Sequence, residues 1–302
     1  MVDSKHLKDV LFKGLFRICG LIAASMIVFI FGFIFIKGIS VFLPSYGPDQ
    51  ISIVSFLTGL EWRGDKGVYG VLFIVINTLL SSFFAVLLSF PVAVLTALFI
   101  VKMAPKWLGS FMKTVIELLA AIPSVVYGVF ASGIIVVWVN NIAQLFNIST
   151  YGGRSFMAVV ILLAFMILPT MASLSITAIE AVDKNLEHAS LALGASKTQT
   201  NYKIVLSSAK SGIFAGLILG LARALGEATA VSMVAGNRTM GPTLNPFDIT
   251  RTLTSTMLSG LSETSGVDYD VRFSVGIVLI VLILVSNVII HKVKRKVGHE
   301  HE

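Results

Sequence analysis

The feature that most constrains this chain is a series of six long apolar segments. They cover residues 14–40, 68–101, 111–140, 155–179, 209–235 and 273–290. An α-helix needs roughly 20 residues to cross about 30 Å of hydrocarbon. Only 13% of the residues are charged and the mean hydropathy is +0.90, whereas about a quarter of the residues of a soluble domain are charged. The sequence therefore predicts an all-α, polytopic membrane protein with six transmembrane helices.

The distribution of Lys and Arg predicts the orientation. Fifteen of these residues lie on the side of the membrane that holds the N-terminus, seven lie on the opposite side, and Arg223 lies within an apolar segment. The positive-inside rule therefore predicts that both termini are cytoplasmic. The net charge of +7 falls on the cytoplasmic side, which favours contact with anionic lipid over binding of nucleic acid. Because the first apolar segment is long and lacks a small-residue cleavage site, we expect a retained anchor.

Several kinds of chemistry leave no trace in the sequence. It contains no phosphate-binding G-x-x-x-x-G-K-[ST] loop, no H-E-x-x-H, no C-x-x-C and no G-x-S-x-G. Its single cysteine, Cys19, indicates neither an intrachain disulfide nor a metal site. We therefore expect a chain that is not an enzyme by itself and holds no metal or cofactor.

Two charges lie inside the fifth apolar segment, Arg223 and Glu227. At 1.5 Å per residue, Arg223 would lie roughly 20 Å from either end of a continuous helix, near the bilayer midplane. A guanidinium there must face protein or water, and Glu227, one turn away, is placed to pair with it. A buried pair that fixes helix register is one interpretation. The other is an anion-contacting site in which Glu227 competes with the anion for Arg223.

Other features of the membrane segments have two interpretations each. Asn77 and Ser81, one turn apart on the second segment, either line a translocation path or bridge helices. Small residues repeat every four positions on the fifth segment, at Gly212, Gly216 and Gly220. We expect this close-packing face to meet a second permease subunit.

The loop 181–208 is long for a helix connection and has its own amphipathic pattern. The pattern predicts a helix, a turn at Gly194 and a second short helix. One interpretation is a connector that lies on the membrane surface. The other is a docking element for a partner protein.

The same loop resembles the coupling loop of ABC importer permeases, E-A-A-x-x-x-G followed by I-x-L-P. Ile204 and Leu206 have the family's offsets from Gly194, but His188 stands at the Glu position, with Glu187 one residue earlier, and Ser207 replaces the Pro. The resemblance implies an ATPase-docking loop whose candidate contacts are Glu187, His188, Ala189, Gly194, Ile204 and Leu206.

Four further stretches resemble the C-type permease subunit of high-affinity phosphate importers. They are residues 67–94, 166–182, "AIPSVVYG" at 121–128 and "RALGEATAVSMVAGN" at 223–237. The resemblance implies a type I ABC importer permease fold at the prokaryotic plasma membrane. Its parts are a cytoplasmic N-terminus (1–13), a first helix with an outer loop (14–67), a permease core (68–290) with the coupling loop, and a basic tail (291–302).

The resemblance also implies a function and partners. The chain would form half of an inorganic phosphate pore that works by alternating access, beside an A-type permease subunit. Two cytosolic ATPase subunits would bind ATP and Mg, and an extracytoplasmic receptor would deliver phosphate. An importer of sulfate or molybdate is the nearest alternative. An ion-coupled secondary transporter would usually show two internal repeats, a channel needs no coupling loop, and a structural assembly factor needs no substrate.

Overall fold

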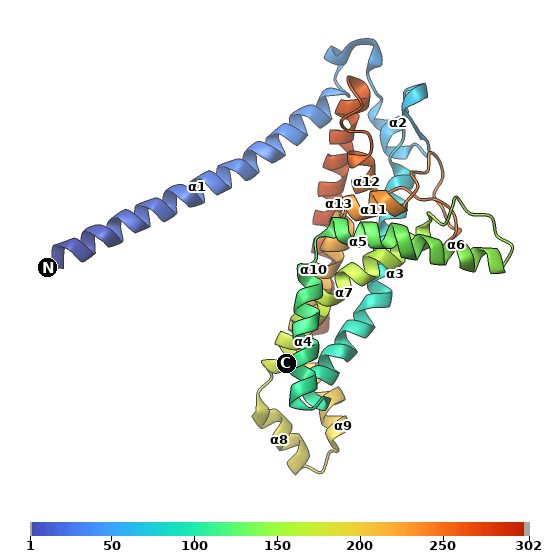
Figure 1. Cartoon of the computed structure of the whole chain (residues 1–302). Coiled ribbons are helices and arrows are strands. Elements are labelled where there is room, and N and C mark those ends of the chain that lie inside the picture. The colour runs from blue at the N-terminus through green and yellow to red at the C-terminus, as the bar shows by residue number, and fades with distance from the viewer. Residues whose placement is uncertain (1, 299–302) are drawn as a thin grey trace.

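The computed structural model describes residues 2–298, which are mostly helical (Figure 1). The α-helices are α1 (Val2–Ser40), α2 (Ile53–Thr58), α3 (Leu72–Leu98), α4 (Lys106–Ala121), α5 (Ser124–Phe130), α6 (Val136–Leu145), α7 (Phe156–Glu180), α8 (Lys184–Ala192), α9 (Lys197–Gln199), α10 (Leu206–Gly226), α11 (Thr229–Val234), α12 (Leu253–Leu258) and α13 (Val267–Gly298). Two 3₁₀ helices, η1 (Pro44–Asp49) and η2 (Gly64–Lys66), and three π-helical turns, η3 (Phe99–Met103), η4 (Ala131–Ile135) and η5 (Thr200–Val205), complete the helical structure. A hairpin of two short strands, β1 (Trp62–Arg63) and β2 (Val68–Tyr69), lies in the first outer loop.

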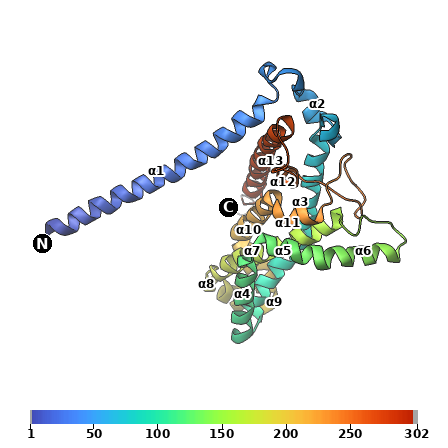
Figure 2. The ribbon, with the colours of Figure 1, turned by 45° about the horizontal axis from the view of Figure 1, so that its top comes forward.

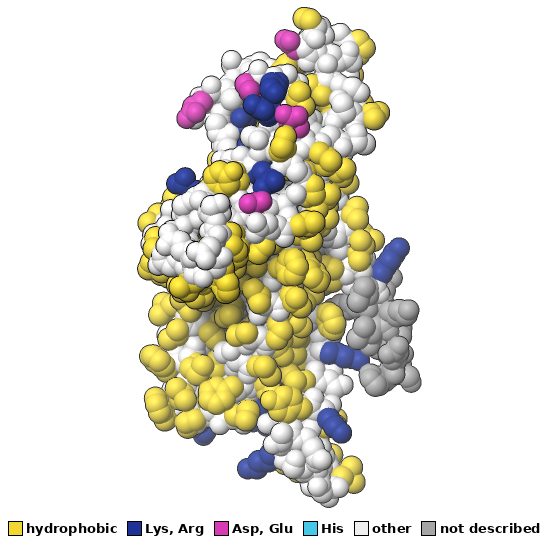
Figure 3. All heavy atoms as spheres, turned by 90° about the vertical axis from the view of Figure 1, so that its right-hand side faces the viewer, with side chains coloured by type: hydrophobic (Ala, Val, Ile, Leu, Met, Phe, Trp, Pro, Cys, Tyr) yellow, Lys and Arg dark blue, Asp and Glu magenta, His cyan; other side chains and the backbone are white. Residues whose placement is uncertain are grey.

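Six of the described helical stretches are long and apolar enough to cross a membrane, which confirms the predicted number. They are Lys8–Ser40, Leu72–Met103, Ser124–Leu145, Phe156–Glu180, Lys197–Gly226 and Val267–Ile290. Figure 3 shows a broad hydrophobic band between two charged ends. On this face one end carries both acidic and basic side chains, and the opposite end shows only Lys and Arg. The cytoplasmic assignment of the basic end stays a prediction.

Two spans differ from the sequence expectation. The third segment, expected at 111–140, is divided where α4 ends at Ala121 and Pro123 precedes α5, because proline has no amide hydrogen and its preceding residue avoids the helical conformation. The fifth, expected at 209–235, begins at Lys197 and ends at Gly226. The second short helix of the loop 181–208 is thus the start of the fifth span.

The core of the bundle is formed by α3, α7 and α10. Buried side chains of α7, among them Leu163, Met166 and Ile167, pack between the other two helices. The glycine stripe of α10 faces α7 of the same chain: a Cβ at Gly212 would come within 2.5 Å of the Cβ of Ala178. The expectation that this stripe meets a second permease subunit is therefore wrong, because the small residues serve close packing of α10 on α7.

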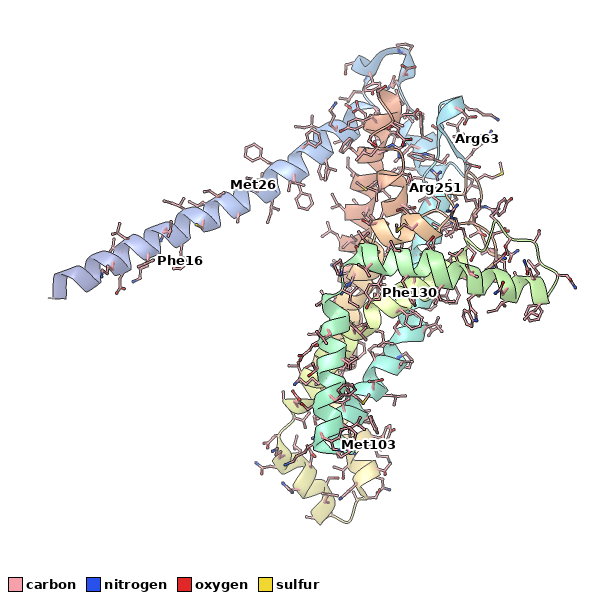
Figure 4. All side chains as sticks on the ribbon, in the orientation of Figure 1. Phe16, Met26, Arg63, Met103, Phe130 and Arg251 are labelled. Atoms are coloured by element: carbon pink, nitrogen blue, oxygen red, sulfur yellow. The ribbon has the colours of Figure 1, made fainter. Side chains whose placement is uncertain are left out.

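Helix α1 leaves the bundle. Its C-terminal end packs on α13, where Lys37 pairs with Asp270 at 3.2 Å and the rings of Phe33 and Phe273 meet edge to face. The rest of the helix, which carries Phe16 and Met26, projects away from the other helices (Figures 1, 2 and 4). The most apolar window of this helix has no buried residue within the described chain. Lipid or another subunit must therefore cover it.

Candidate translocation site

Arg223 lies in the last turn of α10, and its Nη1 donates a hydrogen bond to the hydroxyl of Thr170 on α7 at 2.7 Å. Thr170 is 14 residues from Phe156, the first residue of α7, and so roughly 21 Å along a 25-residue helix. This contact places the guanidinium inside the helix bundle, between α10 and α7. A cation in the last turn also interacts favourably with the helix dipole.

The expected ion pair between Arg223 and Glu227 is wrong. Helix α10 ends at Gly226, and Glu227 has extended backbone angles (φ −74°, ψ 116°), so the two residues do not share a helix face. The carboxylate instead accepts a hydrogen bond from the backbone N–H of Ala230 at 3.0 Å. The physical reason is that the first turn of α11 needs an acceptor for its amide groups. Within residues 2–298, no ion pair joins the two charges.

Two helix breaks precede α5 and α11, which pack on each other near the end of α10 that carries Arg223. One lies between α4 and α5 at Pro123, and the other lies between α10 and α11 at Glu227. Helix α5 packs on α11 at Gly128, where a Cβ would come within 2.9 Å of the Cα of Ala230. The charge of Arg223 acts on the phenol of Tyr127, the residue before this glycine. Non-helical backbone at membrane depth is tolerated where protein buries it or where it lines a water-filled cavity.

These breaks are what the sequence interpretation missed. In discontinuous transporter helices, the broken ends commonly form the substrate site. The segment "AIPSVVYG" contains the Pro123 signal, but Glu227 directly follows Gly226 in the segment that also holds Arg223, and no proline marks the second break. The end of α10 is thus decided by packing of α11 against α5 and α12.

Asn77 and Ser81 lie in the core. Asn77 is fully buried on α3, and its Oδ1 accepts a hydrogen bond from the N–H of Thr243 at 3.1 Å. The Ser81 hydroxyl donates to the carbonyl of Thr78, and the hydroxyl of Thr78 accepts from the N–H of Leu253 at 3.0 Å. The contacts of Asn77 and Thr78 tie Thr243 and Leu253 to α3, whereas the Ser81 bond stays within α3 and bridges no helices. A role in the path stays a prediction for both residues.

The coupling-loop candidates divide into two groups. Glu187 on α8 pairs with Lys102 of η3, and the two side chains are 20% and 15% exposed. His188, Ala189 and Gly194 are exposed, whereas Ile204 and Leu206 are half-buried where η5 continues into α10. Glu187 therefore connects the loop to the second span of its own chain.

The turn after α8 exposes an apolar side chain. Leu193 is 90% exposed, and Gly194 follows it with φ +85°, a conformation that glycine adopts without strain. The side chain of Ser196 caps α9 in a reciprocal capping box with Gln199. The turn and α9 form one end of the molecule in Figure 1. An exposed leucine on a rigid turn is suited to contact with another protein.

A family model described as the binding-protein-dependent transport system inner membrane component matches residues 89–299. The chain belongs to this family of permeases. It is 35% identical over 284 residues to the probable ABC transporter permease protein YqgH of Bacillus subtilis (strain 168), with 93% of this chain and 89% of that protein covered. It is 29% identical over 265 residues to the phosphate transport system permease protein PstC of Pasteurella multocida (strain Pm70), with 82% of each covered.

The fold agrees with this membership. A chain of a bacterial ABC transporter involved in the import of the acidic polysaccharide alginate superposes with a TM-score of 0.56 at 18% identity, covering 93% of this permease and 98% of that chain. The expected importer permease fold is thereby confirmed. Subunits of this kind are non-catalytic pore components, so the permease is not itself an enzyme, and it is a multi-pass protein of the bacterial plasma membrane.

Proposed function

We propose that this permease forms one half of the pore of an ATP-driven importer of inorganic phosphate, and that Arg223 binds the anion in transit. The PstC relatives supply the substrate class. The observation that carries the proposal is the position of Arg223 in the last turn of α10, at the break that precedes α11. Its described hydrogen bond goes to a neutral hydroxyl, that of Thr170, so its positive charge is available to an oxyanion.

The role of Glu227 changes in this proposal. Its carboxylate and its carbonyl hold α11 and α12 in place, since the Thr254 hydroxyl also donates to the Glu227 carbonyl at 2.7 Å. The anion therefore does not need to displace an acid from Arg223. Weak binding, which release requires, follows from the small number of donors at the site.

Half a pore requires a second half. The apolar length of α1 that no described residue covers is consistent with a second permease subunit beside the bundle. We propose an A-type subunit in this position. Two ATPase subunits, which would bind ATP and Mg, would engage the turn at Leu193, and a receptor would engage the outer loops.

Phosphate uptake by proteoliposomes tests the proposal. The vesicles contain the permease with its pore partner, ATPase and receptor, and Arg223→Gln is compared with Arg223→Lys and wild type. We expect Arg223→Gln to abolish uptake while the ATPase still co-purifies, and Arg223→Lys to retain part of it. If Arg223→Gln takes up phosphate at the wild-type rate, Arg223 has a structural role and does not bind the transported anion.

The nearest alternative is import of sulfate or molybdate. Both are tetrahedral oxyanions that a guanidinium also binds. Competition in the same vesicles separates the substrates: phosphate uptake that excess sulfate and molybdate leave unchanged supports phosphate. If the vesicles take up labelled sulfate and not phosphate, the substrate of this permease is sulfate.

A further inference from the structure

The segment between α11 and α12 carries an arginine that pairs with no acidic side chain among the described residues. Arg251 is half-buried, and its Nη2 donates to the carbonyl of Asn237 at 3.2 Å. Its Nε–H is buried and has no hydrogen-bond partner among the described residues. The hydroxyl of the preceding Thr250, also buried, lacks a partner within the same range. Buried donors without acceptors are rare in native proteins.

Two other arginines of these loops are paired with acids. Arg63 lies within 3.7 Å of Glu61 and 3.5 Å of Asp65, and Arg238 within 2.9 Å of Asp248. Across residues 2–298, no ion pair includes Arg251. Acidic residues are therefore present in the same loops, but among the described residues none pairs with Arg251.

A second cation, Arg272, acts on Arg251, and the charge of Asp268 acts on Arg272 in turn. Arg272 on α13 caps α12 through the carbonyls of Thr256, at 2.7 Å, and Ser259. Burial and the charge of Arg272 lower the pKa of Arg251 to about 10. Two like charges in a partly buried site repel one another, and an anion bound between them would relieve this repulsion.

The position of Arg251 connects it with the candidate translocation site. Thr254, three residues further on, donates its hydroxyl to the carbonyl of Glu227, at the break that ends the helix of Arg223. A mainly apolar cavity of about 350 Å³ lies at this break, and Gly226, Thr254 and Arg272 line it together with side chains such as Met257 and Leu258. In Figure 4, Arg251 lies between α12 and the outer end, where Arg63 is labelled.

We propose that Arg251, supported by the charge of Arg272, is a second oxyanion-binding site on the outer side of Arg223. Phosphate released by the receptor binds there before it reaches Arg223. The inference rests on the proposed function, since it supposes that an oxyanion passes this way. A carboxylate from a partner protein is the competing occupant, but a dianion entering from outside fits two neighbouring cations better than a single carboxylate does.

Protection from arginine modification tests the site directly. The purified transporter in nanodiscs is treated with phenylglyoxal, and mass spectrometry follows the modification rate of Arg251 with phosphate, with sulfate and with chloride. At phosphate about ten times its Kd, we expect modification roughly tenfold slower than in chloride. Arg63, which is paired with two acids, is the matched control and should be modified at the same rate in all three salts.

The outcomes separate this inference from the proposed function. If Arg251 is modified equally fast in phosphate, sulfate and chloride, the inference is wrong. The proposed function still stands in that case if Arg223→Gln loses uptake. Protection by receptor alone, without phosphate, also overturns it, because a partner side chain would then cover Arg251. Protection by sulfate at least as strong as by phosphate supports the oxyanion site while it contradicts the phosphate assignment.

A transport measurement adds a second readout. Arg251→Gln should raise the phosphate concentration for half-maximal uptake severalfold while the maximal rate changes less, and Arg251→Lys should restore most of the loss. Arg63→Gln is the control and should match wild type. A maximal rate that falls equally in Arg251→Gln and Arg251→Lys, with an unchanged half-maximal concentration, would indicate a structural role and contradict the proposal.

Discussion

The guanidinium of Arg223 and the hydroxyl of Thr170 are joined by a 2.7 Å hydrogen bond between α10 and α7, deep within the bundle. Sequence separates the two residues by 53 positions. This bond orients the cation at the end of a broken helix and leaves its charge without an acidic partner among the described residues. Orientation and charge can therefore be tested separately.

Replacing Thr170 by valine tests orientation. Thr170→Val keeps the shape of the side chain but removes the oxygen that accepts from Arg223. Stranding a hydrogen-bond donor costs about 1 to 3 kcal/mol, so we expect phosphate uptake to fall roughly tenfold. The control is Thr177→Val, because that hydroxyl bonds only the carbonyl of Ser173 on its own helix. Equal uptake by the two variants would show that Thr170 does not position Arg223.

The ion pair between Lys102 and Glu187 should transmit motion between α8, which carries Glu187, and the second span. Because both side chains are largely buried, breaking the pair by Glu187→Gln should cost about 1 to 2 kcal/mol. We expect fewer phosphate ions transported per ATP hydrolysed. The reversed pair, Lys102→Glu with Glu187→Lys, should recover part of this ratio.

The pair Lys113–Glu180 is the matched control for this prediction. Lys113 Nζ lies 3.0 Å from Glu180 Oε2, but the side chains of this pair are 40% and 45% exposed. Solvent screens such a pair, so Lys113→Gln should change the transport ratio much less. A larger effect of Lys113→Gln than of Glu187→Gln would contradict the special role of Glu187.

The exposed side chain of Leu193 should contribute to ATPase docking. Leu193→Asp places a charge where we expect an apolar groove of the partner, and it should abolish co-purification of the ATPase. The control is Leu244→Asp, because Leu244 is 84% exposed in the outer segment. Loss of the ATPase from both variants would point to misfolding rather than to an interface.

The outer contact of Tyr46 should make stability depend on alkaline pH. Its hydroxyl donates to Asp270 Oδ2 at 3.0 Å, and burial together with this bond raises the pKa of Tyr46 from 10.0 to about 12. Since the folded state holds the proton more tightly, the stabilisation is complete below about pH 10 and is lost as the pH rises through about 12.

Thermal unfolding in detergent measures this dependence. Between about pH 9 and about pH 12, the wild-type unfolding temperature should decline more steeply than that of Tyr46→Phe, which has no phenol to ionise. Tyr151→Phe, at an exposed tyrosine, should keep the wild-type decline. Parallel curves for wild type and Tyr46→Phe would exclude the contact with Asp270 as the source.

The membrane class, the number of spans and the family resemblance follow from the amino-acid sequence alone. Apolar length is a local property, so the first span ends at Ser40 as expected, and Ser155, at the start of the fourth expected segment, caps α7. The sequence also shows that Arg223 lies in an apolar run. A guanidinium buried in the membrane requires polar surroundings, so its need for a polar partner can be predicted without a structure.

The contacts that these residues make depend on the three-dimensional fold. Glu227 bonds to Ala230, Glu187 to Lys102, and the glycine stripe packs on α7. Each of these outcomes depends on which elements lie side by side, and the end of α10 at Gly226 depends on the packing of α11. Hydrogen bonds and ion pairs form with the nearest partner in space, so spacing along the chain predicts them only while the helix continues.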